Sequence, residues 1–233
     1  MWICIVFIAL GVISLVFYLL EKCKNYSLKS VLIKTIVSLF FIATALAAAY
    51  QNGHHVLNVF VISGLIMGLL GDIWLDLKYV YPKEDKVFTL AGFIVFAIGH
   101  ILFITGMIME FIGNNNPLFL LIPLGGAIVF AIANLLLSKP MKLDFKDLKW
   151  VVTGYAFLLA LNPLTALILN ILAGWSSSAL IMLFAGGISF AISDLVLSNT
   201  YFGEGHEKPI DFILNYITYY GAQFLIALSI FFL

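Results

Sequence analysis

The chain has 233 residues, of which 63% are hydrophobic and only 10% are charged, and its mean hydropathy is +1.12. Soluble domains are about half apolar, so this composition is that of an integral membrane protein. The 12 basic and 12 acidic residues balance, which leaves neither a nucleic-acid-binding surface nor a polybasic membrane patch as a function. The two cysteines, Cys4 and Cys23, lie in and just after the first apolar segment, and from them we predict no disulfide and no metal site.

Eight apolar runs of about 20 residues follow one another, the length that a helix needs to cross a hydrocarbon core of roughly 30 Å. No linker or soluble domain interrupts them. The first run has no basic segment before it, so we expect it to stay in the mature protein and not to act as a signal peptide. The sequence predicts an all-α membrane bundle that forms one domain over residues 1–233. Its expected helices are 2–20, 31–50, 56–75, 87–109, 117–137, 150–170, 179–198 and 212–232.

Every basic residue is a lysine, and the lysines are distributed unevenly between the connections. The second, fourth and sixth connections hold none, whereas the odd connections hold Lys22, Lys24, Lys29, Lys78, Lys83, Lys86, Lys139, Lys142, Lys146, Lys149 and Lys208. Because cytoplasmic connections carry the excess of positive charge, the odd connections are predicted to be cytoplasmic and both termini non-cytoplasmic. The expected location is a multi-pass position in the endoplasmic reticulum of a eukaryote or the inner membrane of a bacterium.

A faint internal repeat relates the third and seventh helices. Gly64 precedes Asp72 by eight residues, and Gly186 precedes Asp194 by the same interval. The two helices run in the same direction and lie four helices apart, which suits a parallel duplication about an axis along the membrane normal. The alternative is that small residues recur here only as helix-packing contacts.

Two aspartates lie inside predicted spans, where an isolated charge is costly. Counting about 1.5 Å per residue places Asp72 and Asp194 in one layer, roughly 6–8 Å inside the cytoplasmic edge of the core. Lys34 lies at about the same depth, and Asp76 is one turn below Asp72 on the same helix face. We expect Asp72 and Asp194 to act together. One alternative is that Asp72 pairs with Lys34 to hold helices together. Another is that Lys34 and Asp76 extend to the membrane interface.

By the same rise per residue, three further polar residues, His100, Asn162 and Gln223, are expected about 8–12 Å deeper in the membrane than the two aspartates. With the aspartates they predict a polar cleft that opens to the cytoplasm and narrows toward the middle of the membrane. Each also has a structural interpretation: His100 as a packing or hydrogen-bonding residue, and Gln223 as a hydrogen bond between helices. Asn162 precedes Pro163, so its simplest task is to satisfy backbone groups that a proline kink frees.

A pair of neighbouring carboxylates has a definite chemical use. Two like charges at short range cannot both ionise, so one carboxyl serves as an acid and the other as a base. Such pairs cleave acetal-like and enol-ether bonds through oxocarbenium-like states, as in glycoside hydrolysis. The sequence lacks the residues that other reaction classes require. One intramembrane histidine cannot form a three-histidine zinc site, and no serine lies in a nucleophile elbow.

Four blocks of sequence, in order and at preserved spacing, resemble the YhhN/lysoplasmalogenase family of membrane proteins from about Leu32 to Ser229. They are GLIMGLLGDIWL (64–75), the spacing of Phe88, Gly92, Phe96 and His100, FAISDLVLS (190–198) and TYYGAQFLIALS (218–229). LIKTI around Lys34 is similar to the start of the family's second helix. The chain departs from the family pattern just after Lys34, where a proline is usual, and in GYAFLLALNPLTAL (154–167), where a methionine-containing block is usual.

The resemblance implies hydrolysis of the vinyl ether bond of lysoplasmalogens, 1-alkenyl glycerophosphocholine or glycerophosphoethanolamine, to a fatty aldehyde and a glycerophospho-headgroup, without a cofactor. It implies one protonated and one ionised aspartate as catalytic groups, Asp72 and Asp194, in an order that the residues leave open. The substrate would be a lysophospholipid lying in the bilayer. The expected supporting residues are Lys34 at the lipid phosphate, His100 and Gln223 orienting water or the acids, and Tyr219, Tyr220, Asp76 and Asn162 around them.

Two other classes of function remain open from the residues alone. Intramembrane carboxylates and a parallel repeat also suit a proton-coupled transporter or channel that uses Asp72 and Asp194. A non-catalytic lipid-binding membrane protein is the second alternative, in which both aspartates would contribute to stability only.

Overall fold

The structure is a computed structural model that describes residues 1–23, 27–203 and 209–233. These residues form eight long α-helices, four short 3-10 helices and no strand, which confirms the predicted all-α bundle. All eight long helices are long and apolar enough to cross a membrane. They are α1 (Trp2–Lys22), α2 (Leu28–Asn52), α3 (Val56–Val80), α4 (Asp85–Phe111), α5 (Leu121–Leu137), α6 (Lys149–Leu172), α7 (Ser178–Phe202) and α8 (Pro209–Ser229). The short ones are η1 (Pro82–Glu84), η2 (Pro117–Leu120), η3 (Lys146–Leu148) and η4 (Ile230–Phe232).

The helices keep to the expected spans but differ at their ends. The third helix was expected to end at residue 75, where charged residues interrupt the apolar run, and α3 continues to Val80. It continues because Asp76 is buried against lysines of neighbouring helices instead of facing lipid. The expected helix at 117–137 divides, because Pro117 opens the 3-10 turn η2 before α5 begins.

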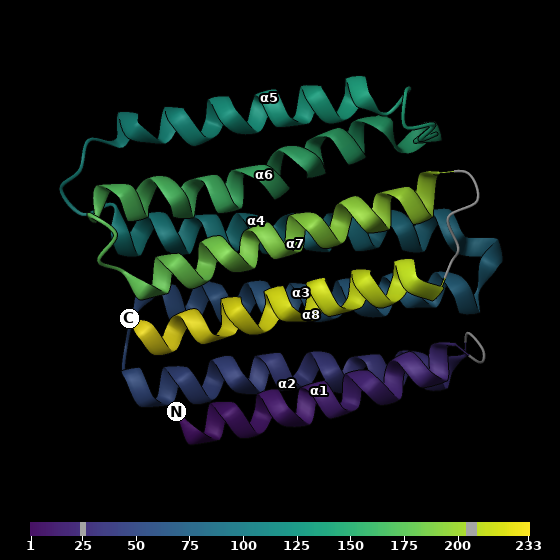
Figure 1. Cartoon of the computed structure of the whole chain (residues 1–233), viewed down its shortest axis with the longest axis horizontal. Coiled ribbons are helices and arrows are strands. Elements are labelled where there is room, and N and C mark those ends of the chain that lie inside the picture. The colour runs from purple at the N-terminus through teal and green to yellow at the C-terminus, as the bar shows by residue number, and fades with distance from the viewer. Residues whose placement is uncertain (24–26, 204–208) are drawn as a thin grey trace.

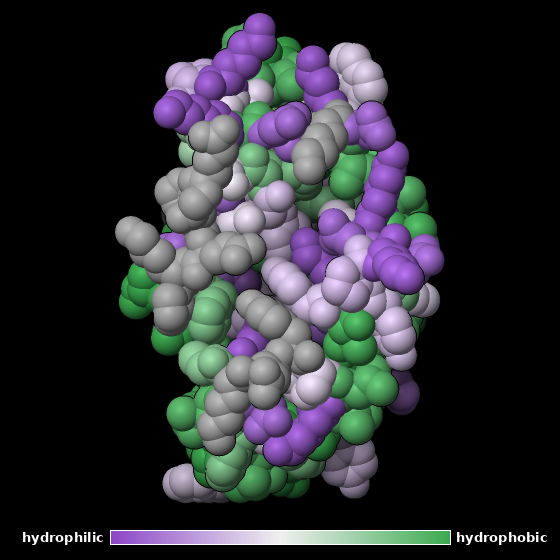
Figure 2. All heavy atoms as spheres, turned by 90° about the vertical axis from the view of Figure 1, so that its right-hand side faces the viewer, coloured by the Kyte–Doolittle hydropathy of each residue, from purple (hydrophilic) through white to green (hydrophobic). Residues whose placement is uncertain are grey.

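The bundle is elongated, with α5 at one edge and α1 and α2 at the other (Figure 1). The helix ends that the odd connections join lie at one end of the bundle, and both termini lie at the opposite end. Of the lysines assigned to the odd connections, Lys24 and Lys208 lie outside the described residues. Hydrophilic side chains gather on the end that carries the odd connections, with patches of apolar ones at its flanks (Figure 2). That this end faces the cytoplasm stays a prediction.

Helix packing repeats between the two halves of the chain. In each half consecutive helices pack as antiparallel neighbours, and α2 packs on α8 as α6 packs on α4. Asp72 is the seventeenth residue of α3 and Asp194 is the seventeenth residue of α7, and both helices have 25 residues. The arrangement therefore supports the parallel duplication over chance recurrence of small residues.

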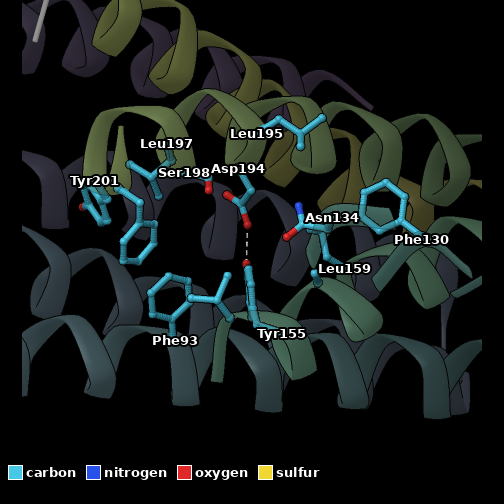
Figure 3. A pocket seen from close by; sticks show the side chains of 13 residues that line it. Phe93, Phe130, Asn134, Tyr155, Leu159, Asp194, Leu195, Leu197, Ser198 and Tyr201 are labelled. Atoms are coloured by element: carbon cyan, nitrogen blue, oxygen red, sulfur yellow. Dashed lines mark hydrogen bonds between the residues drawn. The ribbon is translucent and has the colours of Figure 1, made fainter. Parts of the chain in front are cut away.

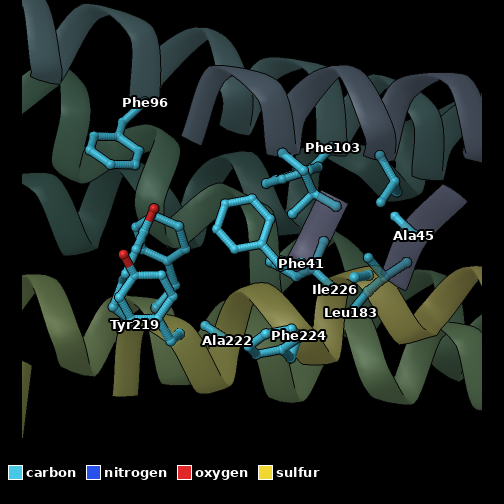
Figure 4. Close-up of a cluster of buried hydrophobic side chains, with 14 of the residues drawn as sticks. Phe41, Ala45, Phe96, Phe103, Leu183, Tyr219, Ala222, Phe224 and Ile226 are labelled. Atoms are coloured by element: carbon cyan, nitrogen blue, oxygen red, sulfur yellow. The ribbon is translucent and has the colours of Figure 1, made fainter. Parts of the chain in front are cut away.

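The apolar core includes side chains of α3 and α6 and a part where side chains of α2, α4, α7 and α8 meet, which Figure 4 shows. Phe41 is fully buried and meets Phe224 edge to face, with the ring centroids 6.4 Å apart. Glycines let the helices approach closely: a Cβ built on Gly64 of α3 would lie 2.3 Å from the ring of Phe103 in α4. Small residues at such crossings are what drives association of helices in lipid, where apolar contacts alone give little preference.

Replacing Gly186 with valine tests this packing. A Cβ at Gly186 would lie 2.8 Å from Cγ1 of Ile226 and 3.1 Å from the backbone oxygen of Ala222, so α7 and α8 must separate. We expect a loss of about 1–3 kcal/mol in the free energy of unfolding, measured by denaturant titration in detergent. Gly125→Val is the matched control, because a Cβ built on Gly125 would meet no neighbouring atom within 4 Å. Equal stability of the two variants would contradict the packing account.

Candidate active site

Asp72 is buried in the middle of the bundle with a side-chain exposure of only 3%. Its Oδ1 lies 3.3 Å from Nζ of Lys34, which α2 supplies. Its Oδ2 accepts hydrogen bonds from Ser38 Oγ at 2.6 Å and from the Tyr219 hydroxyl at 3.0 Å. The negative charge of this carboxylate is therefore compensated by one ammonium and two hydroxyl donors, the satisfaction that a charge in a membrane interior requires.

Asp76, one turn further along α3, is also enclosed. Its Oδ1 lies 3.0 Å from Lys22 Nζ and 3.1 Å from Lys34 Nζ, and its Oδ2 accepts a hydrogen bond of 2.7 Å from Tyr18. Lys34 thus bridges Asp72 and Asp76. The interpretation that Lys34 and Asp76 extend to the membrane interface is wrong, because each residue is only 3% exposed. The pairing of Asp72 with Lys34 is confirmed.

Lys22 was missed as a member of this cluster. The sequence places it just beyond the first apolar run, which assigns it to a connection. In the structure it ends α1, is 4% exposed, and donates a 2.8 Å hydrogen bond to the Tyr18 hydroxyl and another hydrogen bond to the Tyr216 hydroxyl. Its position four residues after Tyr18, on the same helix face, was the available signal.

Asp194 has a different environment. It is half-buried, and its Oδ2 accepts a hydrogen bond from the Tyr155 hydroxyl of α6 (Figure 3). Tyr155 is the seventh residue of α6, as Lys34 is the seventh residue of α2. The repeated helix pairs therefore give one aspartate a lysine partner and the other a tyrosine partner.

Both aspartates line one cavity of about 440 Å³, the aspartate cavity, whose wall also includes Lys34, Tyr155, Tyr201 and Tyr219. The structure thus brings together the two residues that were expected to act as a pair. It separates their immediate partners, however, since Asp72 contacts Lys34 and Asp194 contacts Tyr155. The two carboxyl groups face a common space from different electrostatic surroundings.

The deeper polar residues stand outside the lining of this cavity. His100 is 1% exposed, its Nδ1 is 3.0 Å from Nδ2 of Asn162, and its ring packs on Phe190 at 4.8 Å between centroids. The side chain of Asn162 therefore forms a hydrogen bond with His100. It was expected instead to satisfy backbone groups near Pro163. Gln223 donates a 2.8 Å hydrogen bond to the Tyr219 hydroxyl, which itself donates to Asp72.

Tyr220 supports the site from the other side. Its hydroxyl lies 3.3 Å from Ser38 Oγ, the group that donates to Asp72. Tyr219 therefore contacts Asp72 directly, whereas Tyr220 and Gln223 reach it through one intervening hydroxyl. Ser38 and Tyr155 were missed by sequence reasoning because a serine and a tyrosine in an apolar run carry no distinctive pattern.

Two further cavities adjoin the aspartate cavity. The apolar cavity, of about 450 Å³, shares Asp194 and Tyr155 and is walled mainly by apolar side chains, among them Phe93, Phe130 and Leu159 (Figure 3). The mouth cavity, of about 640 Å³, lies at the end that carries the odd connections and is lined by Lys78, Asp85, Lys86 and Asp147. Tyr201 lines all three cavities, so they lie next to one another around this side chain.

Charges of both signs meet in the mouth cavity. Lys86 Nζ lies 2.6 Å from Asp147, and Lys78 Nζ lies 3.6 Å from Asp85. The hydrogen bond from Lys86 lowers the pKa of the Asp147 carboxyl below its ordinary value. The ammonium of Lys78 also lies 3.3 Å from the centroid of the Tyr201 ring, a cation–π contact.

Eight apolar helices that enclose two carboxyl groups in a cavity define a polytopic α-helical membrane protein with a buried polar site. The sequence model of the YhhN family matches residues 29–230, most of the chain. The chain belongs to the YhhN family. No curated protein and no solved structure matches it.

Proposed function

We propose that this protein is a membrane-embedded hydrolase that cleaves the vinyl ether bond of lysoplasmalogens. The products are a fatty aldehyde and a glycerophospho-headgroup. The observation that carries the proposal is that Asp72 and Asp194 line one cavity with different partners, a lysine for the first and a tyrosine for the second. Carboxyl groups with contrasting surroundings are the equipment of acid–base cleavage at an acetal-like carbon.

The surroundings support an assignment of the two roles. Asp194, beside apolar walls and a hydroxyl donor, is the acid, and Asp72, paired with Lys34, is the ionised carboxylate. Asp194 adds its proton to the vinyl carbon farther from the ether oxygen, which leaves an oxocarbenium ion that the charge of Asp72 stabilises. Water then adds to the carbon bonded to oxygen and gives its proton to a carboxylate. The hemiacetal collapses as the glycerol oxygen takes up a proton and leaves, so one water is consumed in all.

We assign the three neighbouring cavities to the three parts of a lysolipid. The alkenyl chain occupies the apolar cavity, which it can enter from the bilayer between α5 and α7, since α5 packs chiefly on α6. The vinyl ether lies beside Asp194. The phosphate lies in the mouth cavity at Lys78 and Lys86, each of which pairs with one carboxylate, because Lys34 is enclosed between two carboxylates. With the lysine-rich end in the cytoplasm, the headgroup faces that side, in the endoplasmic reticulum of a eukaryote or the inner membrane of a bacterium.

The proposal is tested by aldehyde release from 1-alkenyl lysolipid by purified protein in detergent, with chelator present because the proposed mechanism uses no metal. The 1-acyl and 1-alkyl analogues are the controls, since neither has a double bond to protonate. We expect aldehyde from the alkenyl lipid and no cleavage of the alkyl lipid. Proton or solute flux across vesicles that depends on Asp72 or Asp194, without aldehyde, would favour a transporter instead.

A further inference from the structure

Besides Tyr201, two polar side chains to which the proposed mechanism gives no role line the apolar cavity, Asn134 and Ser198. Both have a buried oxygen without a hydrogen-bond partner in the described part of the chain, Oδ1 of Asn134 and Oγ of Ser198. A buried polar atom left unpaired costs free energy comparable to a lost hydrogen bond, so native structures normally satisfy such atoms with protein or ligand. Two of them in one apolar cavity indicate a bound group.

Asn134 is the one polar side chain of α5, whose sequence is LIPLGGAIVFAIANLLL. A polar residue in such a helix carries a cost in lipid and normally faces a partner or a cavity. The amide of Asn134 is turned toward the pair formed by Asp194 and Tyr155 (Figure 3). Packing of α5 against α6 does not require this amide, since its Oδ1 has no partner among the described residues.

Ser198 reaches the same place from α7. It follows Asp194 by one helical turn, so the two side chains share a helix face, and both line the cavity. Asn134 and Ser198 therefore approach Asp194 from two different helices. The Oδ1 of an asparagine only accepts hydrogen bonds, so the bound group must bring a donor.

We propose that Asn134 and Ser198 form a hydroxyl-binding subsite beside Asp194. This rests on the proposed function only for the identity of the ligand. The hydroxyl has two possible sources with the same chemistry: the free 2-hydroxyl of the glycerol, which lies next to the vinyl ether oxygen in a lysolipid, and the water that attacks the oxocarbenium ion. In the first case the subsite selects lysolipids over lipids acylated at that position, because an unpaired buried acceptor penalises a ligand that lacks the donor.

The experiment combines binding and turnover for wild type, Asn134→Leu and Ser198→Ala. Binding uses a 1-alkyl lysolipid, which has no vinyl ether, and its 2-deoxy analogue, so it needs no catalysis. Turnover uses the two corresponding 1-alkenyl lipids. Asn170→Leu is the matched control, because the buried Asn170 also has an amide without a partner in the described part of the chain but does not line the cavity.

If the lipid supplies the hydroxyl, wild type binds the 2-hydroxyl ligand about tenfold or more tightly than the 2-deoxy ligand, and Asn134→Leu and Ser198→Ala reduce this preference. If water supplies it, wild type shows no preference, and both variants release aldehyde at least about tenfold more slowly from either substrate with binding unchanged. The proposal is overturned if Asn134→Leu matches Asn170→Leu in both measurements. If the variants lose the preference for the 2-hydroxyl ligand but wild type releases no aldehyde, the hydroxyl-binding subsite is supported and the proposed hydrolase activity is refuted.

Discussion

Asp194→Asn is expected to reduce aldehyde release by a factor of about 10²–10⁴, the contribution that a positioned general acid makes to a rate. Asparagine still accepts the hydrogen bond from Tyr155 through its carbonyl oxygen, so the local structure is kept while the transferable proton is lost. The rate is measured as aldehyde formed by purified variant and wild type at equal concentrations of folded protein.

The control for this variant is Glu21→Gln, which removes a carboxylate that pairs with the exposed Lys29 and lines none of the three cavities. It should leave the rate unchanged. Asp72→Asn should also lose most activity, because the charge that stabilises the oxocarbenium ion is gone while Lys34 keeps its pairing with Asp76. Wild-type turnover in either aspartate variant, with the fold intact, would refute the assigned roles.

The largest effect on stability is expected at Asp76. Asp76→Ala leaves Lys22 and Lys34 without the carboxylate that both contact, inside the bundle where neither ammonium reaches water. Breaking a buried ion pair by removing one partner costs about 3–5 kcal/mol, because the remaining charge is left uncompensated. The free energy of unfolding is measured by denaturant titration in detergent.

A second substitution separates this cause from simple loss of packing. Lys22→Met added to Asp76→Ala removes one of the two ammonium groups that Asp76 contacts, whereas Lys34 still pairs with Asp72, and should recover part of the lost stability. Glu21→Ala, which breaks an ion pair whose lysine side chain is 69% exposed, should cost little. If the double variant is no more stable than Asp76→Ala alone, the buried charges are not what makes the single change harmful.

Hydropathy predicts much of this fold, because it reflects the bilayer directly. The eight spans and the shared layer of Asp72 and Asp194 follow from run length and rise per residue. Hydropathy does not predict the helix ends correctly, because it treats Lys22 and Asp76 as charges at the membrane boundary. Only the folded bundle brings these two residues, 54 positions apart, to within 3.0 Å.

The partners of the aspartates were harder to predict. Lys34 stands out because a lysine in an apolar run is rare, whereas Tyr155 resembles the aromatic residues that fill the core. Lys34 and Tyr155 occupy equivalent positions, the seventh residue of α2 and of α6. Sequence comparison does not detect this equivalence, because a lysine does not align with a tyrosine. Asn134 was passed over because a single amide in a membrane helix has many ordinary explanations, and its unpartnered oxygen is visible only in three dimensions.

Protonation of the vinyl carbon by a carboxyl group is the central claim, and the mass of the aldehyde formed in D₂O tests it most directly. The acid exchanges with solvent, so purified protein acting on 1-alkenyl lysolipid should release aldehyde that carries one deuterium on the carbon next to the carbonyl. Product is trapped at once, and unlabelled aldehyde incubated in the same buffer measures exchange after release. Aldehyde without deuterium at that carbon, or no aldehyde at all, would contradict the account.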